Sequence, residues 1–206
     1  MSAPAWWAQA CLALARADPV LGGLIVRFDG ESLASRGEPF ETLLRAIVGQ
    51  QISVAAADAV WGRLREVTDV AQPRALLAAA PDALRAAGLS VRKVDYAGDL
   101  ARHFVDGRLD PARFATLDDA GVVAELTAVR GIGRWSAEMF LLFNLMRPDV
   151  WPVDDIGLQK AVAARYDAGV RPDRRRLDEL GERLRPWRSA ASWLLWRSID
   201  PVDVKY

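Results

Sequence analysis

The sequence has one cysteine and one histidine among its 206 residues. A single thiol, Cys11, excludes a disulfide framework, a four-cysteine iron–sulfur cluster and a cysteine-rich zinc site. Apolar runs such as Met139–Phe143 are far shorter than the roughly 18 residues that a membrane span needs. The N-terminus lacks the basic segment of a secretory signal peptide. We therefore expect a cytoplasmic protein.

The sequence also has no excess of charge of either sign, because 27 Lys and Arg residues balance 27 Asp and Glu residues. A neutral chain creates no global positive field of the kind that attracts nucleic acid. The cations are almost all arginine, since lysine occurs only at positions 93, 160 and 205. Guanidinium groups suit phosphate, but an excess of Arg and Ala also reflects a GC-rich genome, and we favour that simpler cause.

No stretch of the sequence alternates apolar and polar residues in the way that a half-buried strand requires. Apolar residues recur instead at helical spacing, for example at Phe40, Leu43, Leu44, Ile47 and Val48. With 51% hydrophobic residues, the chain can bury a core of its own. We predict an all-α fold of about ten or more short helices.

Capping residues and prolines mark several predicted helix starts. Ser53 follows a break at Gly49–Ile52 and is predicted to cap the next helix. Gly88–Ser90 is predicted to end one helix and to cap another, which runs from about Val91 to Phe104. Asp residues before helices predict caps at Asp110 and Asp173. Prolines that fit the first helical turn stand at positions 73, 81, 111 and 186.

The most informative segment runs from Leu126 to Asp155. Gly131-Ile132-Gly133 is predicted to form a tight turn between two helices, because glycines permit a sharp bend and close approach of another surface. The helix after the turn, over Trp135–Met146, would direct its free N–H groups and positive dipole end outward. The segment therefore predicts a helical hairpin that can hold a phosphate.

Two carboxylates, Asp154 and Asp155, follow Pro152-Val153 at the start of another predicted helix. One interpretation is a helix cap, which aspartate supplies very often. The other is a carboxylate that the helix dipole keeps ionised, facing a reaction that develops positive charge. From the residues alone, both interpretations stay open.

Four stretches together resemble the helix-hairpin-helix DNA glycosylases, and within them the DNA-3-methyladenine glycosylase II type. They are Phe40–Ser53, Gly88–Ala101, Leu126–Lys160, and Pro186–Ser189 with Trp196. The resemblance implies two helical lobes with a helix-hairpin-helix motif and a DNA-binding cleft between them. One lobe would comprise residues 39–146, with the wedge loop and the hairpin, and the other residues 1–38 and 147–206.

The resemblance also implies roles for individual residues. Asp155 matches the catalytic aspartate, and Asp154 would be its capping neighbour. The implied DNA contacts are Gln50, Gln51, Gly131, Gly133, Arg134 and Ser136, of which Gln51 would enter the gap that the displaced base leaves. Backbone carbonyls of Thr127, Val129 and Ile132 match positions that hold a monovalent cation, Na⁺ or K⁺, and no other cofactor is implied.

Aromatic residues supply the implied pocket for the damaged base, lined by Trp135, Met139 and Trp196. A cationic base is attracted to aromatic faces. Relatives that also cut the strand carry a lysine nucleophile at position 135, so the tryptophan implies a monofunctional enzyme that leaves an abasic site. The other tryptophans are expected to be mostly core, at positions 6, 7, 61, 151, 187 and 193.

The implied reaction is hydrolysis of the N-glycosidic bond of a flipped-out base such as 3-methyladenine or 7-methylguanine in duplex DNA. Methylation makes these bases cationic and good leaving groups, so no general acid is needed, which agrees with a single histidine. Asp155 would stabilise the oxocarbenium-like sugar. The partner implied is double-stranded DNA, and we expect a monomer with no membrane partner.

Two alternatives remain at this point. The same fold could act on hypoxanthine, ethenoadenine or mismatched bases, although these neutral bases need proton donors that the sequence does not clearly offer. The chain could also be a non-catalytic DNA-binding module that uses only the hairpin. The run Arg174–Arg176 adds no DNA patch, because acidic residues one turn later predict ion pairs on a solvated helix face.

Overall fold

The computed structural model describes residues 3–35 and 37–199, and within these ranges every regular element is a helix. The prediction of an all-α fold is therefore confirmed. The chain divides into two compact units, one made of Met1–Ser35 with Leu141–Lys205 and the other of Arg36–Phe140, each taken over its described residues. No described helix is both long and apolar enough to cross a membrane.

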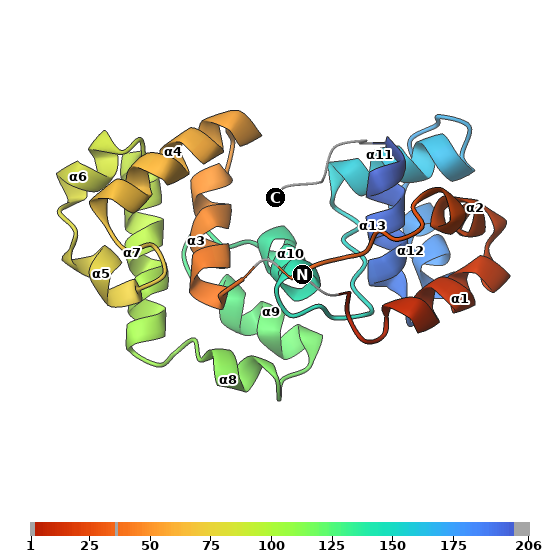
Figure 1. Cartoon of the computed structure of the whole chain (residues 1–206), viewed down its shortest axis with the longest axis horizontal. Coiled ribbons are helices and arrows are strands. Elements are labelled where there is room, and N and C mark those ends of the chain that lie inside the picture. Colours follow the sequence, from red (N-terminus) through yellow and green to blue (C-terminus); the bar gives the residue numbers. More distant parts are fainter. Residues whose placement is uncertain (1–2, 36, 200–206) are drawn as a thin grey trace. The chain divides into compact units, whose positions relative to one another are not determined.

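The unit Arg36–Phe140 is built around α7, which spans Val91–Val105. Helices α3 and α5 pack along α7, and α6 contacts it as well (Figure 1). Further helices complete the unit, and α10 begins in it. In chain order the others are α3 (Pro39–Gly49), α4 (Val54–Val67), α5 (Pro73–Ala78), α6 (Pro81–Ala86), α8 (Pro111–Phe114), α9 (Asp119–Thr127) and α10 (Arg134–Phe143).

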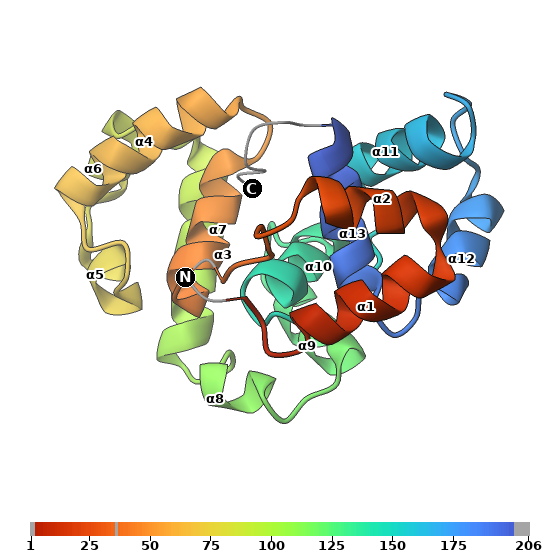
Figure 2. The same cartoon turned by 45° about the vertical axis from the view of Figure 1, so that its right-hand side comes forward.

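The other unit is built around α13, which spans Arg188–Ile199. Its side chains are buried without interruption from Ser189 to Ser198, because helices pack on several of its sides. Among them, α1, α2 and α11 contact α13 directly (Figure 2). The remaining helices of the unit are α1 (Trp7–Ala17), α2 (Pro19–Arg27), α11 (Ile156–Tyr166) and α12 (Arg174–Arg183).

Most of the predicted helix starts are confirmed. Ser53, Asp110 and Asp173 each accept a backbone N–H two or three residues ahead, as N-caps do. Prolines 73, 81 and 111 are the first residues of their helices. The prediction for Pro186 is wrong, because α13 begins at Arg188 and Trp187 still belongs to the preceding turn, where its N–H donates to the carbonyl of Leu184.

Most of the tryptophans expected in the core are there. Those at positions 7, 61, 151 and 193 are buried. Trp6 and Trp187 are only half-buried, and their rings stack with centroids 6.2 Å apart. The indole N–H of Trp6 donates to the carbonyl of Met146 at 2.8 Å, so even this partly exposed tryptophan has a structural contact.

Two of the three arginines in the run on α12 pair with acidic residues one turn along the helix, as predicted, and the third pairs with a residue outside it. Arg174 and Arg175 bind Asp178 and Glu179, one turn along the helix, at 3.1 and 2.8 Å. Arg176 binds Asp167 at 2.9 Å. These guanidinium groups are therefore committed to neighbouring carboxylates.

Candidate functional site

Asp155 is the N-cap of α11, and its side chain is turned into the protein. Its backbone is extended, and Oδ1 accepts the N–H of Leu158 at 2.6 Å. The residue is only 5% exposed. Asp154 is instead exposed and lies 3.6 Å from the guanidinium of Arg174. The prediction that Asp154 is the capping residue is wrong, because α11 begins one residue later than that assignment requires.

A second donor reaches the same carboxylate oxygen from α13. The indole N–H of Trp196 lies 2.8 Å from Oδ1 of Asp155, and Trp196 is only 2% exposed. The indole also stacks on Phe143, with ring centroids 5.9 Å apart. Hydrogen bonds to an ionised group are about twice as strong as neutral ones, so this pair of donors fixes the orientation of the Asp155 carboxylate.

The chain that leads into Asp155 is held along its length. The N–H of Val150 donates to Oγ of Ser189 on α13 at 2.9 Å. At the other end of the segment, the amide of Gln159 donates to the carbonyl of Val153 at 2.9 Å. The Gln159 oxygen in turn accepts from Arg171 at 2.8 Å. These bonds hold the main chain before Asp155 in one conformation.

Gly157, the second residue of α11, leaves the room that this arrangement needs. A Cβ at this position would lie 3.0 Å from Oδ1 of Asp155 and 3.2 Å from Cδ1 of Trp196. Both distances are tighter than ordinary van der Waals contact. Sequence patterns do not indicate a role for Gly157 or Gln159, apart from their position in the helix that follows the aspartates.

The glycine hairpin in the other unit is open on one side. Gly133 immediately precedes α10, and its carbonyl accepts the first hydrogen bond of that helix from Ala137 at 3.0 Å. A Cβ at Gly133 would meet no atom within 4 Å. The first N–H groups of a helix have no partner within it, and the exposed Gly133 puts no side chain in front of them. This end of α10 can receive an anion.

Gly131, by contrast, is closely covered by the protein itself. Its φ is +87°, and a Cβ there would lie 2.8 Å from Cε2 of Tyr96 and closer still to two other ring atoms. Next to it, the N–H of Arg130 donates to Asp99 on α7 at 2.9 Å. Burial alone would raise the pKa of Asp99, but this hydrogen bond and electrostatic interaction with His103 and Arg130 lower it overall. The carboxylate thus anchors the hairpin on α7.

Helix α10 carries four of the predicted site residues. Arg134 is exposed and donates to Glu138 at 2.9 Å, and Ser136 is half-buried in the same first turn. Trp135 is 37% exposed, and Met139 is buried one turn further along. Trp196, the third predicted member of the base pocket, lies in the other unit and binds Asp155 there.

The loop between α3 and α4 carries the two predicted glutamines. Gln51 is exposed and has a positive φ of 60°, which is uncommon for a residue other than glycine. Gln50 is half-buried, and its Nε2 donates to the carbonyl of Gly131 at 2.8 Å. The structure therefore joins this loop to the hairpin.

The three carbonyls predicted to hold a cation lie at the end of α9 and in the turn that follows. Thr127 is the last residue of α9, where helix carbonyls carry partial negative charge. The carbonyl of Val129 accepts the N–H of Ile132 at 3.1 Å, and a carbonyl oxygen has a second lone pair. The donor set is thus of the kind that suits a monovalent cation.

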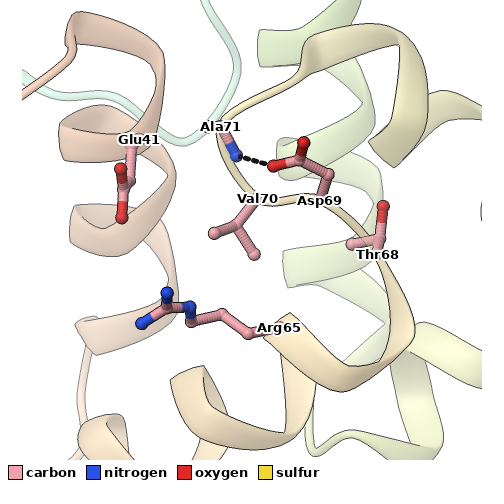
Figure 3. Close-up of a pocket in the computed structure, with 6 residues that line it drawn as sticks. All are labelled: Glu41, Arg65, Thr68, Asp69, Val70 and Ala71. Atoms are coloured by element: carbon pink, nitrogen blue, oxygen red, sulfur yellow. Dashed lines mark hydrogen bonds between the residues drawn. The ribbon is translucent and has the colours of Figure 1, made fainter.

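A surface pocket of about 360 Å³ lies at the opposite end of α3 from the glutamine loop (Figure 3). Glu41 and Arg65 bring opposite charges to it, and Asp69 closes a turn by accepting the N–H of Ala71 at 3.0 Å. Thr68 and Val70 also line this pocket. It contains none of the predicted site residues.

The chain is similar in sequence to known DNA repair proteins. Residues 44–186 match the profile described as HhH-GPD superfamily base excision DNA repair protein. DNA-3-methyladenine glycosylase 1 of Schizosaccharomyces pombe is 31% identical over 170 residues, which cover 81% of this chain and 75% of that protein. DNA-3-methyladenine glycosylase 2 of Escherichia coli is 29% identical over 187 residues, or 85% of this chain and 63% of the relative.

Solved structures show the same similarity. The DNA-3-methyladenine glycosidase of Bacillus halodurans superposes with a TM-score of 0.77 at 32% identity, covering 88% of this chain and 89% of that one. The S. pombe 3-methyladenine DNA glycosylase in complex with abasic DNA gives a TM-score of 0.81 at 27% identity, covering 96% and 99%.

Proposed function

The chain belongs to the HhH-GPD superfamily of base excision DNA repair proteins, and from this premise we propose that it is a monofunctional DNA glycosylase for alkylated bases. Its substrates would be cationic bases such as 3-methyladenine and 7-methylguanine in duplex DNA. The observation that carries the proposal is the buried carboxylate of Asp155, held by two N–H donors on one oxygen. The relatives named for 3-methyladenine support the choice of substrate.

The chemistry asked of Asp155 is electrostatic. A base inside a stack cannot be reached, so the nucleotide is first flipped out, at a cost of about a few kcal/mol. The bond between the sugar and a cationic base breaks without a general acid, because the base leaves as a neutral molecule. Positive charge then develops on the sugar, and a preorganised anion in a water-poor site stabilises it. Water adds to the sugar and gives up a proton to the solvent, which leaves an abasic site.

The hairpin would bind the DNA backbone. Its exposed glycine and the N-terminus of α10 offer N–H donors to a phosphate, and Arg134 adds a positive charge beside them. The structure of the relative from S. pombe is a complex with abasic DNA, which supports DNA as the partner. Because phosphate binding releases counterions, affinity for DNA should fall steeply with salt.

Two residues of α10 bear on the type of glycosylase. Trp135 stands where strand-cutting relatives are expected to carry a lysine nucleophile, so no Schiff base with the sugar would form at that position. Its partly exposed indole can contact a cationic base through its face, worth roughly 0.5–2 kcal/mol. Met139 would line the same wall one turn further along.

The liberated base identifies the substrate class. The protein is incubated with methylated duplex DNA and with duplex DNA containing hypoxanthine, and released bases are identified by mass spectrometry. Release of 3-methyladenine and 7-methylguanine supports the proposal, and release of hypoxanthine alone would overturn the substrate class. No release of any base would favour a non-catalytic DNA-binding module.

The remaining expectations also stay proposals. The carbonyls of Thr127, Val129 and Ile132 would hold Na⁺ or K⁺, supported by their place at the C-terminal end of α9 and in the adjoining turn. A cation there would stiffen the hairpin without taking part in bond cleavage. The protein would act as a monomer in the cytoplasm.

A further inference from the structure

The side chain of Gln50 joins two loops that lie 81 residues apart in the sequence. Its Nε2 donates to the carbonyl of Gly131 at 2.8 Å. Gln50 directly follows the last residue of α3 and immediately precedes Gln51, whereas Gly131 opens the hairpin turn. The amide that the sequence analysis assigned to DNA is therefore engaged within the protein.

Helix α7 holds both of these loops. Near its start, Nζ of Lys93 donates to the carbonyl of Val48 in the last turn of α3 at 2.7 Å, and burial lowers the pKa of this ammonium group. One and two turns later, Tyr96 covers Gly131 and Asp99 binds the hairpin backbone. Helices α3 and α7 lie side by side in both views (Figures 1 and 2). A single helix thus sets the position of each loop.

The conformation of Gln51 needs such support. A φ of 60° is unfavourable for a residue with a Cβ, and such conformations persist only where the surroundings over-determine them. Gln50, the residue before Gln51, is hydrogen-bonded to the hairpin. The last turn of α3, which precedes Gln50, is hydrogen-bonded to Lys93. Both restraints act on the main chain that leads into Gln51.

We propose that Gln50 is a positioning residue, which fixes the Gln51 loop to the hairpin so that the two act on DNA as one rigid part. The proposal rests on the proposed glycosylase function. The hairpin would hold the phosphate backbone of the DNA. If the distance between the hairpin and Gln51 is fixed, the side chain of Gln51 can enter the space in the duplex that the base vacates as it flips out. Gln50 would thereby favour flipping of a paired base, and would matter little for a base that has no partner.

The test compares two substrates and two variants. One duplex carries 7-methylguanine opposite cytosine, and the other carries it opposite a one-nucleotide gap. Q50M removes the amide donor at nearly constant length, and Q72M makes the same change at an exposed glutamine that has no cap hydrogen bond. Loss of one hydrogen bond should lower single-turnover excision from the paired duplex about fivefold to tenfold in Q50M. Q50M should excise 7-methylguanine from the gapped duplex at the parental rate. Q72M should excise it at the parental rate from both duplexes.

Equal losses on the two substrates would overturn the proposal, because direct DNA contact or general damage to the fold predicts them. Amide hydrogen exchange of the free protein supplies a second readout, independent of activity. Q50M should speed exchange in residues 50–53 and 130–133 together, while Q72M changes neither segment. An unchanged hairpin in Q50M would refute the link. A parent that releases no base refutes the proposed function, and exchange still decides whether Gln50 couples the loops.

Discussion

Asp155 and Gly133 occupy the same backbone position, the residue immediately before a helix, in different units of the chain. In each case the carbonyl accepts the first hydrogen bond of the helix at 3.0 Å, from Gln159 to Asp155 and from Ala137 to Gly133. Asp155 is buried, and its own carboxylate accepts a further N–H of its helix. Gly133 is exposed and has no side chain to do so.

The difference shows how one property of helices can serve two purposes. A helix N-terminus favours a negative charge. Helix α11 carries its own anion, fixed in a buried place where charge acts strongly. Helix α10 leaves the position open, and we propose that a DNA phosphate occupies it. The first arrangement suits catalysis and the second suits binding.

The largest expected effect comes from removing the charge of Asp155 while keeping its shape. In D155N, the amide oxygen can still accept from Leu158 and Trp196, so the protein should stay folded with a loss of about 1–2 kcal/mol as the charged acceptor becomes neutral, and DNA affinity should stay near that of the parent. Single-turnover excision of 7-methylguanine should fall by a factor on the order of 100 or more, because the anion proposed to stabilise the sugar is lost. Excision at the parental rate would show that the buried carboxylate has only a structural role.

The next largest effect is expected from placing a carboxylate immediately before α10, as Asp155 stands immediately before α11. G133D has room for its side chain, since a Cβ there meets no atom within 4 Å. The carboxylate should cap α10 and repel a phosphate, lowering affinity for duplex DNA by roughly 100-fold with no loss of stability. G133S is the matched control, because serine also caps but adds no charge. Equal DNA affinity in G133D and the parent, measured by fluorescence anisotropy, would mean that the phosphate binds elsewhere.

A smaller effect should follow from crowding Asp155 rather than replacing it. In G157A, the new methyl group would press on Oδ1 of Asp155 and on Trp196, and displace the carboxylate by a few tenths of an ångström. Small misplacements of a catalytic group are costly, so we expect an excision rate about tenfold lower at unchanged DNA affinity. G62A, at a helical glycine with nothing within 4 Å, should excise like the parent. Equal excision rates in G157A and G62A would show that excision tolerates a small displacement of the Asp155 carboxylate.

The smallest effect concerns the anchor of the hairpin on α7. D99N should lower the free energy of unfolding at neutral pH by about 1 kcal/mol, because a charged acceptor becomes neutral. The pKa of Asp99 is lowered in the folded protein, so the ionised carboxylate stabilises the fold above its unfolded pKa of about 4. That stability is lost as the pH falls through the lower folded pKa. Urea unfolding should therefore show the two proteins converging below about pH 4, and a pH-independent difference would contradict this origin.

Sequence patterns predicted what depends on neighbours in the chain. Helical periodicity indicated the all-α fold, and the caps at Ser53, Asp110 and Asp173 were found because a cap bonds only two or three residues ahead. The predicted cap of α11 was wrong by one residue, because Asp155 and not Asp154 caps the helix. Either aspartate can start a helix, and only the packing of the rest of the unit selects the one that does.

Contacts between distant segments could not be predicted in the same way. Trp196 lies 41 residues from Asp155, and Gln50 lies 81 residues from Gly131. Nothing in the local sequence around these residues indicates their partners, since they meet only after several helices have packed. Gly157 is hidden for the same reason, because its lack of a side chain matters only beside Trp196.

The most direct measurement asks whether Asp155 recognises positive charge where the sugar develops it. Duplex DNA carrying a cationic pyrrolidine in place of the damaged nucleotide's sugar is compared with the same duplex carrying a neutral tetrahydrofuran. The parent should bind the cationic duplex at least about tenfold more tightly, as it would a transition state, and D155N should bind the two equally. A preference that survives in D155N, or that is missing from the parent, would contradict electrostatic stabilisation by this carboxylate.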